Sequence, residues 1–190
     1  MELRESIENY QPFDNDEEEI KRRIIRNMDI YPDVLTRDND KCHFASSALV
    51  LNKERSKALV VYHNVYRSWL TPGGHADGDS DLLHVALKEV EEETGQKATV
   101  LDDNIFQLSI SPIVGHMKRG KFVKPHEHMD AFYLLEADDS LPLTYRPDES
   151  QGVKWIPIEG LLDEDNTVSF MHPVHKRMVK KLIRDGYIKK

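Results

Sequence analysis

The sequence has little cysteine, no long apolar run and fewer bases than acids, and each shortage excludes a class of protein. Cys42 is the one cysteine among 190 residues, so no disulfide forms within the chain, which suits a reducing cytoplasm. No apolar run approaches the roughly 20 residues that cross a bilayer. The first ten residues contain no basic segment followed by an apolar stretch, so we expect neither a secretory signal nor a membrane partner.

Basic residues are outnumbered by acidic ones, 26 against 34, for a net charge of −8. This balance predicts no broad nucleic-acid surface, and an anionic ligand would need a metal ion or a local basic patch. The charge is also uneven: residues 1–20 carry eight acids and one base, whereas residues 171–190 carry seven bases and one acid. Three interpretations follow: the two ends dock on each other, they dock on a second subunit in a homodimer, or they form two solvated helix faces.

A helix is expected near the start of the chain. Residues 14–29 repeat apolar side chains every fourth position, as a helix with one buried face would, and Asp14 or Asp16 can cap its start. Residues 1–39 are therefore interpreted as an N-terminal helical extension, packed on a main domain that comprises residues 40–190.

The main domain alternates short strands with helices. Its expected helices cover residues 80–94, which stop at the natural C-cap Gly95, and the stretch from Pro173 to Gly186. Strands interleaved with two or three helices indicate a mixed α/β fold in layers. The expected strands are residues 43–51, 57–62, 97–101, 105–112, 129–136 and 152–157.

Three glutamates of the helix over residues 80–94 share one face. Glu89, Glu92 and Glu93 are spaced i, i+3 and i+4. At about 100° per residue, Glu93 falls inside the arc of apolar side chains and Glu89 lies at its rim, whereas Glu91 points away from both. Acids beside a core repel one another and are costly to desolvate, and a divalent cation removes that cost.

The same stretch indicates which ion to expect. Carboxylate oxygens suit Mg²⁺ or Mn²⁺, and we find no cluster of cysteine and histidine that suits zinc. The turn at Gly73 and Gly74, ahead of the helix, permits close backbone approach, so a carbonyl there is a further candidate ligand. The competing interpretation is a solvated acidic helix face without a ligand.

The stretch that begins at Gly74 resembles the signature of the Nudix hydrolases, G-x5-E-x7-R-E-U-x-E-E-x-G-U, where U is an aliphatic residue. Gly74 and Gly95 match its two glycines, and Glu89, Glu92 and Glu93 match its last three glutamates. The resemblance implies an α/β/α sandwich with a mixed sheet. It also implies metal-dependent attack of water on a phosphoanhydride (pyrophosphate) bond, in a nucleoside diphosphate linked to another group.

Three positions depart from the pattern: Ser80 replaces the first glutamate, Lys88 the arginine and Gln96 the final aliphatic residue. Lysine keeps the positive charge of arginine but loses the planar fork that orients carboxylates. Because the three metal-facing glutamates are intact, we expect activity to persist, with a less rigidly held site.

By resemblance, the Gly73 carbonyl, Glu89, Glu92 and Glu93 hold one or more Mg²⁺ or Mn²⁺ ions. The reaction then needs a general base within hydrogen-bond reach of the attacking water, and two candidates stay open. Glu92 lies at the edge of the carboxylate cluster. Glu149 lies in the loop before the last expected strand, at an offset where some family members carry a catalytic or metal-binding glutamate. The alternative for Glu149 is an exposed loop acid.

The segment of residues 125–136 places His126, His128 and Asp130 on one face of an expected strand, by period-two alternation. We interpret His128 and Asp130 as contacts for substrate phosphates or ribose and His126 as structural, with ordinary strand-end roles as the alternative. Zinc binding by this trio is not expected, because no further ligand group is evident. His43, at the start of an earlier strand, is interpreted as a structural histidine.

The expected protein is therefore a cytoplasmic Nudix-type pyrophosphohydrolase that acts on a small-molecule nucleotide. Pro112, sixteen residues after the signature, resembles a proline of ADP-ribose-hydrolysing relatives and favours nucleotide sugars over nucleoside triphosphates. One alternative is a non-catalytic nucleotide-sensing module, which Ser80 and Lys88 favour. Another is diphosphate isomerase chemistry, which would need a reactive cysteine in the site, and the placement of Cys42 does not suggest one.

Overall fold

The computed structural model describes residues 2–118, 120–147, 150–165 and 167–189. Its helices are α1 (Leu3–Asn9), α2 (Asn15–Ile30), α3 (Leu82–Thr94) and α4 (His172–Arg184), with 3-10 turns at Ile158–Leu162 and Ser169–Met171. The strands of the main sheet are β1 (Cys42–Asn52), β2 (Lys57–His63), β3 (Ser68–Leu70), β4 (Gly73–His75), β5 (Thr99–Ile113), β8 (His126–Ala137) and β9 (Ser150–Pro157). A separate hairpin contains β6 (His116–Lys118) and β7 (Lys121–Val123).

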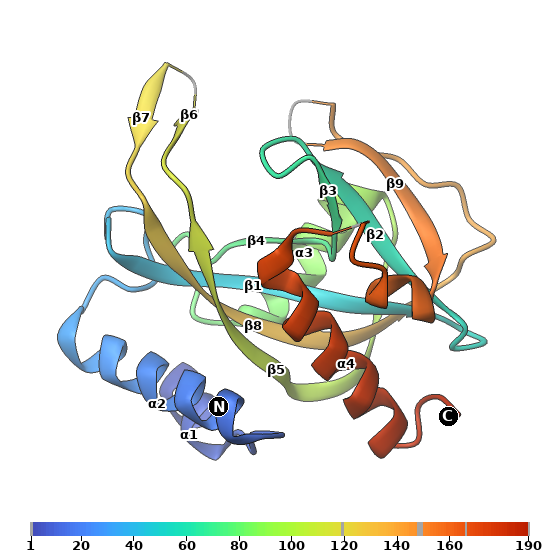
Figure 1. The fold of residues 1–190 in the computed structure, drawn as a ribbon, viewed down its shortest axis with the longest axis horizontal. Coiled ribbons are helices and arrows are strands. Elements are labelled where there is room, and N and C mark those ends of the chain that lie inside the picture. Colours follow the sequence, from blue (N-terminus) through green and yellow to red (C-terminus); the bar gives the residue numbers. More distant parts are fainter. Residues whose placement is uncertain (1, 119, 148–149, 166, 190) are drawn as a thin grey trace.

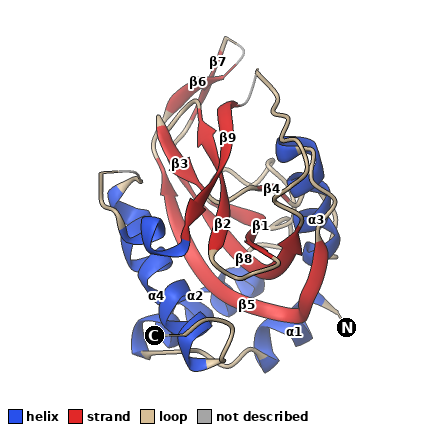
Figure 2. Cartoon of the chain, turned by 90° about the vertical axis from the view of Figure 1, so that its right-hand side faces the viewer, coloured by secondary structure: helices blue, strands red, loops and turns tan. Residues whose placement is uncertain are grey.

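The main sheet is mixed. Its strands lie in the order β3-β2-β1-β8-β5, with β4 paired to β1 and β9 paired to β2. Strands β1 and β8 are parallel, and the other pairs are antiparallel. Helix α3 lies on one side of this sheet and α4 on the other, while the β6–β7 hairpin rises from its end (Figures 1 and 2). The expected α/β/α sandwich with a mixed sheet and N-terminal helices is confirmed.

Period-two alternation along β1 builds two separate cores. Phe44 and Ala48 pack with residues of α3 and of the N-terminal helices, Ile24 among them. Leu49 and Leu51 point to the other face and pack with α4. In the part of the chain that the structure describes, no helix combines the length and the apolar composition required to cross a bilayer.

Strand β5 replaces two strands that the sequence predicts separately, over residues 97–101 and 105–112. The polar residues between them do form a local turn, because the Asn104 amide donates to Asp102 Oδ1 at 2.9 Å. Pairing with β8 shifts register there and then resumes at Gln107. The expected break is therefore a bulge within one long strand.

The acidic and basic ends of the chain meet around a buried ion pair. Glu17 of α2 and Lys181 of α4 lie 2.8 Å apart, and both are almost fully buried. Tyr10 donates to Glu17 at 2.5 Å, and Lys181 also donates to the Phe106 carbonyl at 2.8 Å. Burial lowers the pKa of Lys181 to about 8, against the opposing effect of Glu17. The buried carboxylate of Glu17 and the buried ammonium of Lys181 thus neutralise each other.

A second ion pair joins the same elements, because Arg177 Nε contacts Asp14 Oδ2 at 3.0 Å. Asp14 also caps α2 by accepting from the Glu17 amide at 2.9 Å. Of the three interpretations of the charge asymmetry, docking of the two ends on each other is the one observed. No second subunit is needed to explain it.

The Glu17–Lys181 pair gives a stability prediction. Glu17→Gln should lower the free energy of unfolding by about 3–5 kcal/mol, because it leaves a buried ammonium without its counter-charge. Combining it with Lys181→Met should cost about 1–3 kcal/mol less than the sum of the two single changes. Urea unfolding measures all three variants.

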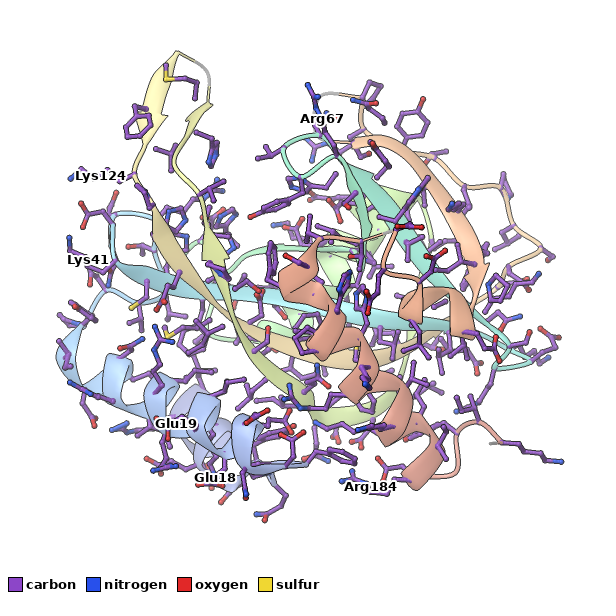
Figure 3. The ribbon with its side chains drawn as sticks, viewed as in Figure 1. Glu18, Glu19, Lys41, Arg67, Lys124 and Arg184 are labelled. Carbon is purple, nitrogen blue, oxygen red and sulfur yellow. The ribbon has the colours of Figure 1, made fainter. Side chains whose placement is uncertain are left out.

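The matched control is Glu18→Gln, because Glu18 lies on the outer surface of the same helix beside Glu19 (Figure 3). It should change the unfolding free energy by no more than about 0.5 kcal/mol. Additive effects of the two buried substitutions would contradict the pairing.

Candidate functional site

Strand β4 directs the polar groups of Gly73 away from its neighbour β1. The Pro72 carbonyl accepts from Ala48 and the Ala76 amide donates to Phe44, so the alternating positions between them face the other way. The Gly73 amide donates to Glu93 Oε2 at 3.0 Å. By the same alternation, the Gly73 carbonyl lies on the side of the strand where Glu93 meets the Gly73 amide.

Two of the three candidate glutamates converge on this strand. Glu93 is buried and holds the Gly73 amide. The carboxylate of Glu89 is half-buried against Gly74: a Cβ added to Gly74 would lie 2.4 Å from Glu89 Cδ. Helix α3 is capped at both ends. Asp81 caps its start by accepting from the His84 amide at 3.0 Å, and Gly95 ends it in the left-handed conformation.

The third glutamate has a different partner. Glu92 is half-exposed, and its Oε2 accepts from Arg146 Nη1 at 3.1 Å. Arg146 precedes Glu149 by three residues in the sequence, and Glu149 lies outside the described residues. The sequence analysis does not identify Arg146, because its contact with Glu92 joins positions 54 residues apart and no local spacing indicates it.

His128 and Asp130 lie side by side on one face of β8, as the alternation predicts. In the parallel ladder His128 is opposite His43 of β1, and Asp130 is opposite Ala45. Asp130 is buried; burial raises the pKa of its carboxyl to about 6, with a hydrogen bond from Ser111 acting in the opposite direction. His128 and Asp130 lie on the face of the sheet against which α4 packs, at the end of that face that α4 does not cover.

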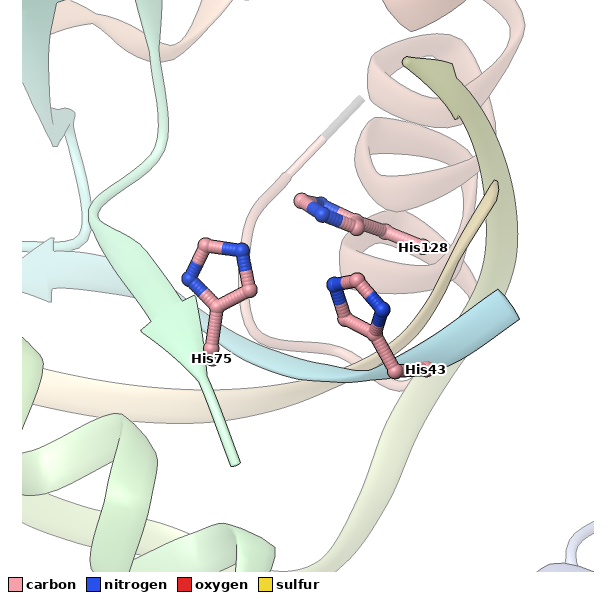
Figure 4. Close-up of side chains that lie close together, drawn as sticks. All are labelled: His43, His75 and His128. Carbon is pink, nitrogen blue, oxygen red and sulfur yellow. The ribbon is translucent and has the colours of Figure 1, made fainter. Parts of the chain in front are cut away.

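The structure also brings two further histidines to His126 and His128, and this corrects the expectation that no other ligand group lies near them. His43 of β1 and His75 of β4 join them, with ring centroids 4.7–5.3 Å apart in five pairs. Figure 4 shows the rings of His43, His75 and His128 turned toward one another. The interpretation of His43 as a structural histidine with all its hydrogen bonds satisfied is wrong in one respect: no residue that the structure describes makes a hydrogen bond to its buried Nε2.

Burial favours the neutral form of two histidines of the cluster. Burial lowers the pKa of His128 well below its ordinary value, and the three neighbouring imidazoles lower it further. Burial also lowers the pKa of His43, although a hydrogen bond to the Asn39 carbonyl acts in the opposite direction.

Comparison with known proteins places the chain in a family. A family model described as the NUDIX domain matches residues 42–181. The chain belongs to the Nudix family. The matched region contains every strand of the main sheet together with α3 and most of α4.

Several curated Nudix relatives are similar in sequence. An RNA pyrophosphohydrolase of Pelagibacter ubique is 27% identical over 140 residues, which are 70% of this chain and 87% of that protein. An m7GpppN-mRNA hydrolase of Xenopus laevis is 35% identical over 86 residues, 45% of this chain and 27% of its own length. A probable DHNTP pyrophosphohydrolase of Lactococcus lactis is 28% identical over 105 residues, 53% of this chain and 58% of its own. The chain therefore spans less than two thirds of the last two relatives.

Solved Nudix structures share the fold. A NUDIX-family hydrolase from Clostridium perfringens superposes with a TM-score of 0.52 at 21% identity, covering 74% of this chain and 97% of that one. The E. coli dihydroneopterin triphosphate pyrophosphohydrolase gives a TM-score of 0.53 at 12% identity, covering 72% and 94%. These similarities establish the architecture of the sheet and its flanking helices.

Two of the departures from the Nudix pattern, at Ser80 and Lys88, can be described by their surroundings. The acidic residues beside Ser80 stabilise the start of α3: Asp79 accepts from the Asp81 amide at 2.9 Å and contacts the His84 ring at 2.8 Å. Lys88 Nζ reaches Glu89 Oε1 at only 3.5 Å, so it supplies charge without a short hydrogen bond.

The Glu89 and Glu93 carboxylates and the Gly73 carbonyl fit a hard divalent cation. All three offer oxygen, the donor that Mg²⁺ and Mn²⁺ prefer. The Glu89 carboxylate lies in a cradle against Gly74 that exists only because Gly74 has no side chain. The chemistry of the donors and the cradle at Gly74 are thus both compatible with the metal that the family implies.

This cradle gives a direct prediction. Gly74→Ala should displace the Glu89 carboxylate and weaken Mn²⁺ binding by roughly 10–100-fold, which a titration followed by electron paramagnetic resonance would measure. Gly152→Ala is the control, because the nearest atom to its added Cβ is on Trp69 at 3.5 Å. Unchanged Mn²⁺ affinity in Gly74→Ala would show that Glu89 is not a ligand.

Proposed function

We propose that the chain is a divalent-metal-dependent pyrophosphohydrolase, which cleaves a phosphoanhydride bond in a nucleoside diphosphate linked to another group. One observation carries the proposal: Glu93 and Glu89 of α3 converge on the Gly73–Gly74 backbone. We assign the Gly73 carbonyl, Glu89, Glu92 and Glu93 as ligands of Mg²⁺ or Mn²⁺. When bound, such an ion supplies charge neutralisation at the pyrophosphate and a lower pKa for the attacking water.

The chain's own residues have one proton to move. Water attacks phosphorus, the bond from phosphorus to the bridging oxygen breaks, and the proton of the water passes to a carboxylate. We assign that carboxylate to Glu92 or to Glu149. The contact of Arg146 with Glu92 at 3.1 Å supports the first assignment because it orients the Glu92 carboxylate; Glu149 follows Arg146 by three residues in the sequence.

The substrate class is proposed from the relatives and from three residues. The names of three similar proteins point to substrates that contain a pyrophosphate bond. They are an RNA pyrophosphohydrolase, a probable DHNTP pyrophosphohydrolase and a solved C. elegans Ap4A hydrolase. We propose that His128 and Asp130 contact substrate phosphate or ribose. Pro112 of β5 favours ADP-ribose and related nucleotide sugars within this class.

A nucleotide-sensing module on the same fold is the second candidate. Lys88 favours it, because its 3.5 Å approach to Glu89 is a weaker restraint than a forked arginine would give. For either function we propose the cytoplasm as the compartment, in agreement with the free and buried thiol of Cys42.

A substrate panel separates the two candidates. ADP-ribose, a nucleoside triphosphate, diadenosine tetraphosphate and a 5′-triphosphate RNA would each be incubated with Mg²⁺ or Mn²⁺, and products resolved by chromatography. We expect ADP-ribose to be cleaved and a Glu92→Gln/Glu93→Gln double variant to be slower by at least about 10³-fold. Glu91→Gln is the control, because this exposed glutamate of the same helix faces away from β4.

Two outcomes of the panel would contradict the hydrolase. Full turnover by the double variant would remove the carboxylates from the mechanism. Tight binding of a nucleotide without any product would favour the sensing module. Circular dichroism of the double variant would verify that the loss of rate is not a loss of fold.

The identity of the general base is tested by comparing Glu92→Gln with Glu149→Gln. Replacing a residue that is the base alone should lower kcat by about 10²–10⁴-fold and leave Mn²⁺ affinity unchanged, because the proton moves only in the transition state. This outcome is expected for Glu149→Gln if Glu149 is the base. Glu92 is also assigned as a ligand, so Glu92→Gln should weaken Mn²⁺ binding whether or not Glu92 is the base. If both variants keep the wild-type kcat, neither residue is the base.

A further inference from the structure

Four imidazoles from three strands meet at one end of the sheet. His43 comes from β1, His75 from β4, and His126 and His128 from β8. The ligand atoms of His43, His75 and His128 all lie within 4.8 Å of one another. His43 is 4% exposed, and the other two are half-buried. Four histidines from distant parts of a chain rarely gather in this way for packing alone, since each brings polar nitrogens that must be satisfied.

Two of these histidines have their tautomer fixed by the backbone. His43 Nδ1 lies 3.0 Å from the Asn39 carbonyl, and His126 Nδ1 lies 2.8 Å from the Lys124 carbonyl. A carbonyl oxygen only accepts, so Nδ1 carries the proton in both rings and Nε2 presents a lone pair. A histidine that donates one ring N–H to a carbonyl while the other nitrogen stays free is the usual arrangement of a metal ligand.

The Nε2 atoms of these two rings have different surroundings. Among the residues that the structure describes, none makes a hydrogen bond to the buried His43 Nε2. His126 Nε2 lies 3.2 Å from His128 Nε2. Ligands of a tetrahedral ion with bonds of 2.0–2.1 Å are separated by roughly 3.3 Å, so this spacing matches one edge of such a site. A cation among the rings would satisfy His43 Nε2, and it would take the place of the proton between His126 Nε2 and His128 Nε2.

We propose that His43, His75 and His128, joined by His126, bind a first-row transition cation such as Zn²⁺, at a site separate from the carboxylates of α3. Imidazole nitrogen suits Zn²⁺, Co²⁺ and Ni²⁺, whereas Mg²⁺ requires oxygen ligands. The ion links β4 to both β1 and β8 through side chains. The proposal is independent of the hydrolase function, because it concerns other residues and another donor chemistry.

The test uses the full chain without a polyhistidine tag, stripped with EDTA and titrated with Co²⁺ in the presence of millimolar Mg²⁺. We expect one Co²⁺ per chain with the intense visible absorption of a four-coordinate site, displaced by Zn²⁺. His75→Gln and His128→Gln should each weaken binding by at least about 100-fold, more than the loss of an outer-shell contact. Zn²⁺ should also raise Tm by several degrees, because it binds only the folded chain.

Two controls place the ion. His172→Gln removes a histidine outside the cluster whose Nε2 also lies near a carbonyl, that of Glu164 at 3.2 Å, and should bind Co²⁺ as the unaltered chain does. A Glu89→Gln/Glu93→Gln double variant should also keep the Co²⁺ signal. Loss of the signal in that variant would move the ion to the carboxylates and overturn the proposal.

A measurement on the unaltered chain guards against variants that fail to fold. Histidine ring ¹⁵N resonances should shift for the four cluster histidines, and not for His172, when one equivalent of Zn²⁺ is added. The proposal would be overturned if the ring resonances did not shift at saturating Zn²⁺, or if binding persisted in both histidine variants. Either result would show that the rings contact one another through hydrogen bonds and do not bind the ion.

Discussion

The close approach of strand β4 to its neighbours on both sides is the constraint on which the candidate site depends. A Cβ on Gly73 would lie 2.3 Å from Ser47 Oγ, and one on Gly74 would lie 2.4 Å from Glu89 Cδ. Two successive glycines therefore let three residues of backbone fit between β1 and the carboxylates of α3. Because His75 follows directly in the same strand, that fit also fixes where the histidine cluster forms.

The N-terminal segment supports this arrangement from the other side. The Asn39 carbonyl orients the ring of His43, and the Val34 carbonyl accepts from Phe44 at the start of β1. The Leu35 carbonyl accepts from Gly78, in the loop between β4 and α3. The same segment is tied to α4 through the buried Glu17–Lys181 pair. The segment between α2 and β1 thus contacts both sides of the candidate site, and α2 ties it to α4.

The sequence predicts what short-range periodicity controls. The helical spacing of Glu89 and Glu93, the cap at Gly95 and the alternation of His126 and His128 follow from local geometry, and the structure has them in place. It does not predict Arg146 beside Glu92 or His43 beside His128. Those contacts depend on loop path and on the parallel register of β1 with β8, between positions 85 residues apart. The polar residues at Asp102 predict a break between two strands, and this prediction is wrong for a related reason. Strand β5 pairs with β8 on both sides of these residues, so they form a bulge within one strand.

Two sets of donors with different chemistry meet at strand β4. The oxygen atoms of Gly73, Glu89 and Glu93 are donors of the kind that a hard cation prefers. Imidazole nitrogens at His43, His75 and His128 attract Mg²⁺ poorly but suit a softer ion. Transition cations bind both kinds of donor, so affinity alone does not sort the ions between the sites; donor type and geometry do. The backbone carbonyl that fixes the proton on His43 Nδ1 leaves its Nε2 able to accept a cation and unable to donate to a phosphate oxygen. That asymmetry argues that this histidine serves a metal ion rather than the substrate.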